Sequence, residues 1–193
     1  MSYATRYAEI KAYNPHGLRG TLRNVALDGL ATAYQVGGRM ERALQRPRVQ
    51  FLYIHHTFTD ELAGLERLIK DLARHHSFIS HSEAVERVRN GTIDKPYIAF
   101  SSDDGFKNNL DGGRLLHAHG ISACFFVNPG LIGGFESCAS AERGCHIGNG
   151  AVPSNSLCLR RDHVVLDWPL GHVRYFLANN ALNANAANNL FPA

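Results

Sequence analysis

Two adjacent carboxylates, Asp103 and Asp104, stand directly before Gly105. Residues 96–100 ahead of them are apolar and strand-like, so the pair falls where the alternation of a strand breaks into a loop and both carboxylates can turn into one site. Neighbouring carboxylates repel each other, so a cation, a proton or hydrogen bonds must stabilise the pair. The sequence therefore predicts either a metal-and-base site or a simple Asp-Gly turn at this strand end.

The residues around the pair predict a β-α-β unit. Residues 107–119 have the character of a helix, and 121–127 form a second apolar, strand-like run. This context favours a site over a turn, because strands that alternate with helices indicate a parallel sheet or barrel. A phosphate-binding sheet protein is a weaker interpretation, since it needs a glycine-rich loop after a strand and Gly112-Gly113 falls inside the predicted helix.

Three stretches of this sequence resemble the polysaccharide deacetylase family, the chitin-deacetylase-like carbohydrate esterases. Residues 100–106 read F-S-S-D-D-G-F, where the family has a strand ending in T/S-F-D-D-G. Residues 120–127 read G-I-S-A-C-F-F-V, where the family has G-I-x-A-T-F-F-V after a helix. Residues 51–56 read F-L-Y-I-H-H, similar to the family's first barrel strand, which ends in Tyr-His or His-His. The resemblance covers residues 49–132.

The resemblance implies a hydrolase that removes N-acetyl groups from a glycan by breaking a non-peptide carbon–nitrogen bond. It implies that Asp103 is the general base and that Asp104 binds a divalent metal ion, usually zinc. A bound metal ion lowers the pKa of a water to about 7 and polarises the acetyl carbonyl, and an adjacent carboxylate accepts the proton. The metal ion also relieves the repulsion between the two carboxylates.

The metal site that the resemblance implies is incomplete in this sequence. Catalytic zinc usually has three protein ligands, and the family takes two of them from an H-S/T-x-x-H motif after D-D-G, whereas this chain contains no H-x-x-x-H. Stretches similar to the lead-in of that motif, at 144–149 and 171–173, are not followed by histidines at the ligand positions. The alternative expectation is an inactive or truncated deacetylase remnant that binds zinc weakly and at most a carbohydrate or another partner.

Two histidines, His55 and His56, end the first strand of the resemblance and are the candidates to replace the missing ligands. Active sites of β/α barrels lie at the carboxyl ends of the strands, so one of the two is a candidate to face Asp103 and Asp104. The favoured interpretation is a hydrogen-bonded histidine at the rim of the site. Ser102 departs from the aromatic residue of the family, and the loss of about 1.5–3 kcal/mol of apolar burial predicts a looser site.

Composition narrows the partners and the location. The 193 residues, 45% of them hydrophobic, suffice for one globular domain with a core. The net charge of +3 is too small to indicate nucleic acid or an anionic membrane as a partner. No apolar run reaches the roughly 18 residues of a membrane span, and the chain begins without a signal-peptide core. The default location is the cytoplasm, with export left open because the family is often exported.

The pattern along the chain predicts an α/β fold, a partial (β/α) barrel of the polysaccharide-deacetylase type with about four parallel strands. The expected strands are 49–54, 77–80, 96–101 and 121–127. Three segments follow from this pattern: an N-terminal helical extension over 1–48, the deacetylase-like β/α domain over 49–132, and an irregular, disordered tail over 133–193. Within the extension, Gly37-Gly38 is expected to split the helix.

Overall fold

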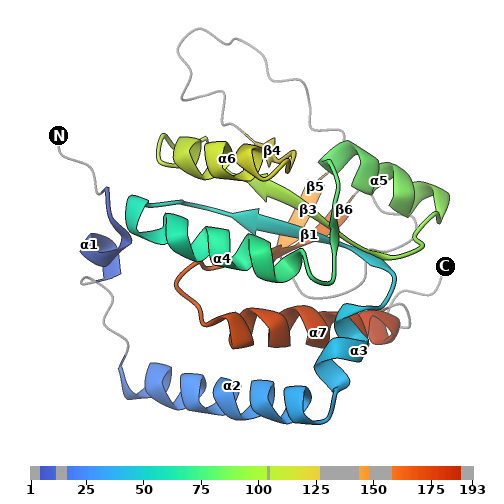
Figure 1. Cartoon of the computed structure of the whole chain (residues 1–193), viewed down its shortest axis with the longest axis horizontal. Helices are drawn as coiled ribbons and strands as arrows, with labels where there is room; N and C mark the ends of the chain where they lie inside the picture. Colours follow the sequence, from blue (N-terminus) through green and yellow to red (C-terminus); the bar gives the residue numbers. More distant parts are fainter. Residues whose placement is uncertain (1–4, 12–16, 104, 127–143, 148–157, 188–193) are drawn as a thin grey trace, which may run out of the picture.

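The computed structural model describes residues 5–11, 17–103, 105–126, 144–147 and 158–187, which form an α/β fold (Figure 1). The strands are β1 (Arg48–Ile54), β2 (Ser77–Phe78), β3 (Pro96–Ser102), β4 (Cys124–Phe125), β5 (Gly144–Ile147) and β6 (Cys158–His163). The helices are α1 (Tyr7–Lys11), α2 (Leu18–Val36), α3 (Arg39–Leu44), the short 3-10 helix η1 (Thr59–Glu61), α4 (Leu62–Leu72), α5 (His81–Asn90), α6 (Asn109–Ala118) and α7 (Leu170–Ala187).

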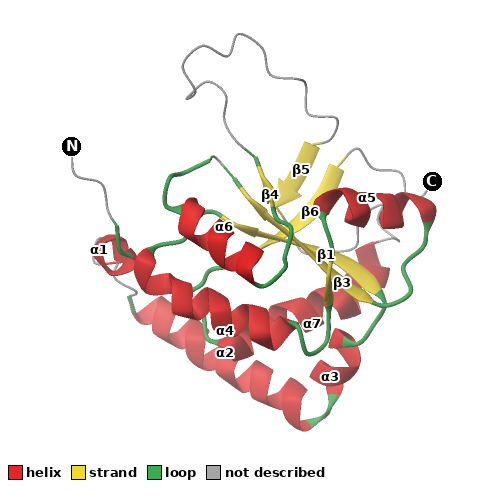
Figure 2. Cartoon of the chain, turned by 45° about the horizontal axis from the view of Figure 1, so that its top comes forward, coloured by secondary structure: helices red, strands yellow, loops and turns green. Residues whose placement is uncertain are grey.

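Strand β1 is the centre of the sheet (Figure 2). The strand order is β2-β3-β1-β6-β5, with β4 also paired to β3, and each of these pairings is parallel. β1 and β3 pair from Arg48 opposite Pro96 to Ile54 opposite Ser102. The prediction of an α/β fold with parallel strands is confirmed, whereas closure of the sheet into a barrel stays a prediction.

The two faces of the sheet are covered by different helices. Leu52 and Ile54 of β1 belong to a large hydrophobic cluster that also contains residues of α4 and α7. Phe51, which points to the other face, belongs to a smaller cluster with Ala84 of α5. Because side chains alternate along a strand, β1 is buried on both faces, and this explains why residues 51–54 form a continuous apolar run.

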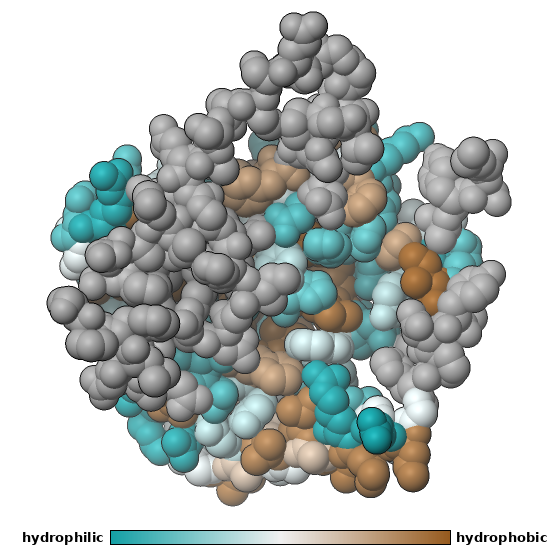
Figure 3. Space-filling model, turned by 180° about the vertical axis from the view of Figure 1, so that it is seen from behind, coloured by the Kyte–Doolittle hydropathy of each residue, from teal (hydrophilic) through white to brown (hydrophobic). Residues whose placement is uncertain are grey.

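The N-terminal extension is divided as its sequence predicts. α2 ends at Val36, Gly38 adopts a positive φ of 62°, and α3 begins at Arg39, so the two glycines split the helix. Several apolar side chains of α2 are exposed, among them Leu18 (77%) and Val36 (84%). Figure 3 shows hydrophobic residues at the lower edge of the molecule, on the side where α2 lies in Figure 1.

The prediction of an irregular, disordered tail over 133–193 is wrong for its described parts. These contain β5, β6 and α7, and the side chains of Leu177 and Ala178 in α7 are 2% and 0% exposed. The Asn/Ala-rich composition was misleading because alanine is the best helix former and because apolar residues of α7 recur on one face. None of the described helices is both long enough and apolar enough to cross a membrane.

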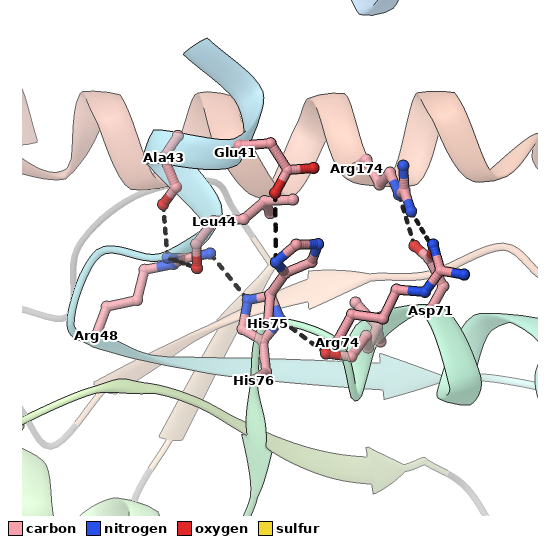
Figure 4. Close-up of polar contacts among 10 residues, drawn as sticks. Glu41, Ala43, Leu44, Arg48, Asp71, Arg74, His75, His76 and Arg174 are labelled. Atoms are coloured by element: carbon pink, nitrogen blue, oxygen red, sulfur yellow. Dashed lines mark hydrogen bonds and ion pairs between the residues drawn. The ribbon is translucent and has the colours of Figure 1, made fainter. Parts of the chain in front are cut away.

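A polar network joins β1 to the neighbouring helices (Figure 4). Arg48 donates from Nη1 to the carbonyl oxygens of Ala43 and Leu44, and from Nη2 to His76 Nε2 at 3.1 Å. Burial, and then the charge of Arg48, lower the pKa of His76 to about 4. His76 is therefore neutral near pH 7 and accepts a hydrogen bond from Arg48, which holds the start of β1 against the ends of α3 and α4.

The same buried region contains a carboxyl group of β6. Asp162 Oδ1 accepts a hydrogen bond of 3.0 Å from Asn180 Nδ2 of α7, and Gln50 of β1 also bonds to this side chain. Burial raises the pKa of Asp162 to about 6, although these hydrogen bonds and Arg48 lower it. Asp162, which β6 places next to the central strand, therefore depends on hydrogen-bond partners in β1 and α7.

The two buried groups predict opposite pH dependences of stability. Between pH 6.5 and 4, His76 is protonated in the unfolded chain but not in the folded one. The free energy of unfolding therefore falls by about 3 kcal/mol as the pH drops through this range. Between pH 6 and 3.8 the folded chain protonates Asp162 first, which raises the free energy of unfolding by about the same amount. The two effects offset each other in the native protein.

We therefore expect Asp162→Asn to reveal the pH dependence of stability that His76 causes. In urea unfolding at a series of pH values, the free energy of unfolding of this variant should fall by about 3 kcal/mol more than that of the native protein between pH 6.5 and pH 4. His76→Gln should show the reverse, a free energy of unfolding that rises as the pH falls. Equal pH dependences in all three proteins would contradict this interpretation of the network.

Candidate functional site

Three strands bring polar side chains to the same edge of the sheet. Since β1 and β3 are in register up to Ile54 and Ser102, the residues that follow, His55 and Asp103, lie side by side where the strands end. On the other side of β1, Tyr53 lies opposite His163, the last residue of β6. The carboxyl ends of parallel strands meet at one edge of a sheet, so this edge collects the candidate reactive groups.

The aromatic rings of this edge are in contact. The rings of Tyr53 and His163 are stacked, with centroids 4.7 Å apart and an angle of 21° between their planes. The ring of His55 lies edge-on to His163, with a centroid distance of 6.1 Å, and 6.0 Å from Tyr53. Tyr53, which is 3% exposed, thus holds His163 beside His55.

Asp103 lies near enough to His163 to affect the pKa of the imidazole. Burial lowers the pKa of His163 below its ordinary value, the neighbouring His55 lowers it further, and the carboxylate of Asp103 opposes both by raising it. A lowered pKa keeps the imidazole neutral near pH 7, the form that ligates metal ions or accepts protons. We call His55, Asp103 and His163 the strand-end cluster.

The two predicted histidines separate into different surroundings. His55 belongs to the strand-end cluster, with its ring 6.1 Å from that of His163. The ring of His56 instead lies between Phe58, at 5.6 Å, and Phe106, at 4.4 Å between centroids. The ring of His56 also lies 5.6 Å from that of His55, so His56 joins this aromatic group to the strand-end cluster.

A buried asparagine ties the strand ends to α6. Nδ2 of Asn109, a residue that is 3% exposed, donates to the carbonyl oxygen of His55 at 3.0 Å and to Ser102 Oγ at 2.7 Å. Ser102 is itself 6% exposed. Ser102 is thus used as a hydrogen-bond acceptor. This contact opposes the loosening that the sequence predicts from the absence of an aromatic side chain at this position.

The donor set of this edge suits zinc in its chemistry. Imidazole nitrogens and carboxylate oxygens are zinc ligands, and two imidazoles on one tetrahedral zinc ion have ring centroids roughly 5 Å apart. The rings of His55 and His163 are 6.1 Å apart, so they would have to approach by about 1 Å. Within the described parts of the chain, no three potential ligand side chains already converge on one point. Asp104, the predicted ligand, lies outside the described residues.

Sequence reasoning missed His163. The stretch that precedes it, 158–162, reads Cys-Leu-Arg-Arg-Asp, and three consecutive charged residues do not look like a strand beside the centre of a parallel sheet. The available signal was a histidine at the end of a short segment followed by Val164 and Val165, and only the pairing of β6 with β1 gives that histidine its neighbours.

Comparison of this chain with models of known protein families, with characterised proteins and with solved structures finds no match. The resemblance described above therefore rests on the quoted motifs.

We expect mutations in the strand-end cluster to shift the pKa of His163 in opposite directions. Asp103→Asn should lower it, because the carboxylate stabilises the imidazolium, and His55→Gln should raise it, because a neighbouring imidazolium is removed. Histidine proton resonances followed by NMR over a pH titration measure both shifts. Asp94→Asn, at the opposite end of β3, is the control and should have no effect. If both cluster variants leave the pKa of His163 unchanged, the three side chains do not meet.

We expect Gly112→Ala to destabilise the site. A Cβ at Gly112 would lie 2.6 Å from Oγ1 of Thr57, a side chain that is 3% exposed and has no room to move. The free energy of unfolding should fall by about 1–2 kcal/mol. Gly29 lies in an exposed position of α2 with open space around it. Gly29→Ala should therefore raise the free energy of unfolding by up to about 1 kcal/mol, because alanine has the higher helix propensity. Equal effects of the two changes in denaturant unfolding would contradict the close contact of α6.

Proposed function

We propose that this protein is a metal-dependent hydrolase that removes acetyl groups from the nitrogen atoms of an N-acetylated glycan. The meeting of His55, Asp103 and His163 at the carboxyl ends of three neighbouring parallel strands carries this proposal. The D-D-G motif supplies one member of the group and determines the reaction class. His163 supplies an imidazole at the site from a part of the chain without the family's histidine motif.

The proposed fold is the partial (β/α) barrel of the polysaccharide deacetylases. Its support is the parallel pairing of β3, β1 and β6 and the position of the polar cluster, because β/α barrels carry their active sites at the carboxyl ends of the strands.

Each residue of the strand-end cluster has a role in the proposed reaction. Asp104, His55 and His163 would hold a zinc ion, and Asp103 is the general base that accepts the proton of the attacking water. When bound, the ion supplies a polarised acyl carbonyl and a water of lowered pKa. Tyr53 orients His163 by stacking on it, and Asn109 holds the backbone of His55 in place.

The charge balance of the cluster supports these roles. His163 is neutral near pH 7 because burial and His55 lower its pKa, so its lone pair is available to an ion. The carboxylate of Asp103 raises the pKa of this imidazole, so the proposed base lies near the proposed ligand.

The experiment that tests this function separates metal binding from hydrolysis. We expect one zinc ion per chain by isothermal titration calorimetry, with an affinity that falls by at least about tenfold in His163→Ala. The exposed histidine of α6 provides the control, His117→Ala, which should bind zinc as the native protein does. Release of free amine from an N-acetylglucosamine oligomer should be lost in Asp103→Asn.

Two outcomes would contradict the proposal. Equal zinc affinities in His163→Ala and His117→Ala would remove His163 from the site. Zinc binding without any release of amine by the native protein would favour the inactive deacetylase remnant that the missing H-x-x-x-H motif also allows.

A further inference from the structure

A groove of about 460 Å³ opens beside the strand-end cluster. Its volume is within the range of small-molecule sites, and it begins at His56, the residue that follows His55. Figure 1 shows that α1 lies beyond the carboxyl end of β1, and two residues of this part of the chain, Thr5 and Ile10, form one wall of the groove.

Aromatic rings line the groove. The ring of His56 is stacked on that of Phe58, with an interplanar angle of 27°, and is tilted by 36° from that of Phe106. Phe106 is 40% exposed, while Phe58 is 4% exposed. Phe106 therefore presents an aromatic surface to the solvent-filled space, directly after the D-D-G motif.

The exposed surface of the groove is mostly apolar, with few polar groups. Thr59 and Asn108 add a hydroxyl and an amide group, and Lys107 and Asp111 add one charge of each sign. The lining therefore has no excess charge to attract an ionic ligand. An apolar surface with a few polar groups matches an uncharged ring that has an apolar face and a polar edge.

We propose that this groove is a subsite for one pyranose ring of the glycan, which stacks its C–H face on Phe106 while its hydroxyl groups meet the polar residues around it. The identity of the glycan rests on the proposed function, whereas binding of the ring does not depend on catalysis. The adjacent strand-end cluster would then act on the N-acetyl group of the neighbouring sugar.

The wall of the groove is held by a side chain from elsewhere in the sequence. Asp60 of η1 accepts hydrogen bonds from the backbone N–H groups of Tyr7, at 2.7 Å, and Ala8, at 3.1 Å. The carbonyl oxygen of Thr5 accepts from the backbone N–H and the hydroxyl of Thr59, at 3.3 and 3.1 Å. Asp60 thus caps the first turn of α1, which is too short to be stable alone. Removing this carboxylate should release the wall.

The inference is tested with the full chain and a tetramer of N-acetylglucosamine as the probe, by isothermal titration calorimetry without added zinc. We expect Phe106→Ala and Asp60→Ala each to weaken binding of the tetramer by about fivefold. Two matched controls should bind it as the native protein does: Phe125→Ala, which removes an equally exposed phenylalanine outside the groove, and Asp94→Ala, which removes an exposed carboxylate at the far end of β3.

The outcomes distinguish this inference from the proposed function. Tetramer binding that depends on Phe106 and Asp60, with no release of amine after zinc is added, would support the subsite and contradict the deacetylase activity. Amine release with tetramer affinities that are unchanged in both groove variants would overturn the subsite alone. Weaker binding of an apolar probe such as decanoate in the Phe106→Ala variant, with tetramer affinity unchanged, would also overturn it and identify the groove as an acyl-chain site.

Discussion

The parallel pairing of β1 on both of its sides determines which side chains meet. β1 and β3 are in register over seven residue pairs, and β6 joins β1 where Tyr53 lies opposite His163. A shift of one residue in either pairing would turn every side chain of the shifted strand to the other face of the sheet. The apolar side chains of β1, buried on both faces, oppose such a shift. The same burial that stabilises the core therefore brings His55, Asp103 and His163 together.

The position of β6 beside this central strand depends on buried polar contacts. Asp162 is hydrogen-bonded to Asn180 of α7, and Arg48 of β1 is bonded to His76 after α4. Buried polar groups are costly unless they have partners, so this arrangement favours one relative placement of β1, β6 and α7. α7 thus contributes to the site although none of the residues of the strand-end cluster belongs to it.

The sequence predicts the parts of this fold that have a local signal. The apolar runs at 49–54 and 96–101 became β1 and β3, the glycine pair split the N-terminal helix, and the D-D-G motif marked the end of β3. β6 and His163 could not be predicted in this way, because the charged residues of β6 lack the apolar pattern of an inner strand and the contact with Tyr53 joins residues far apart in the sequence. α7 was missed because its Asn-rich composition hid a helix with a buried apolar side.

Two consecutive histidines connect the strand-end cluster with the groove: His55 belongs to the cluster, and His56 lines the groove. His55 turns toward the reactive groups, and His56 turns toward Phe58 and Phe106. The two rings lie edge-on to each other with centroids 5.6 Å apart, so the cluster and the aromatic group are in direct contact. A reactive cluster and a ring-binding surface can thus lie next to each other with only one residue step between them.

The proposed site depends most on the placement of His163, which a two-dimensional nuclear Overhauser spectrum of the native protein tests directly. We predict cross-peaks from the ring protons of His163 to the ring protons of Tyr53, because the two rings are stacked at 4.7 Å, and weaker ones to His55. If His163 shows no contact with either ring, β6 does not pair with β1 in this register, and the proposed metal site has lost one of its ligands.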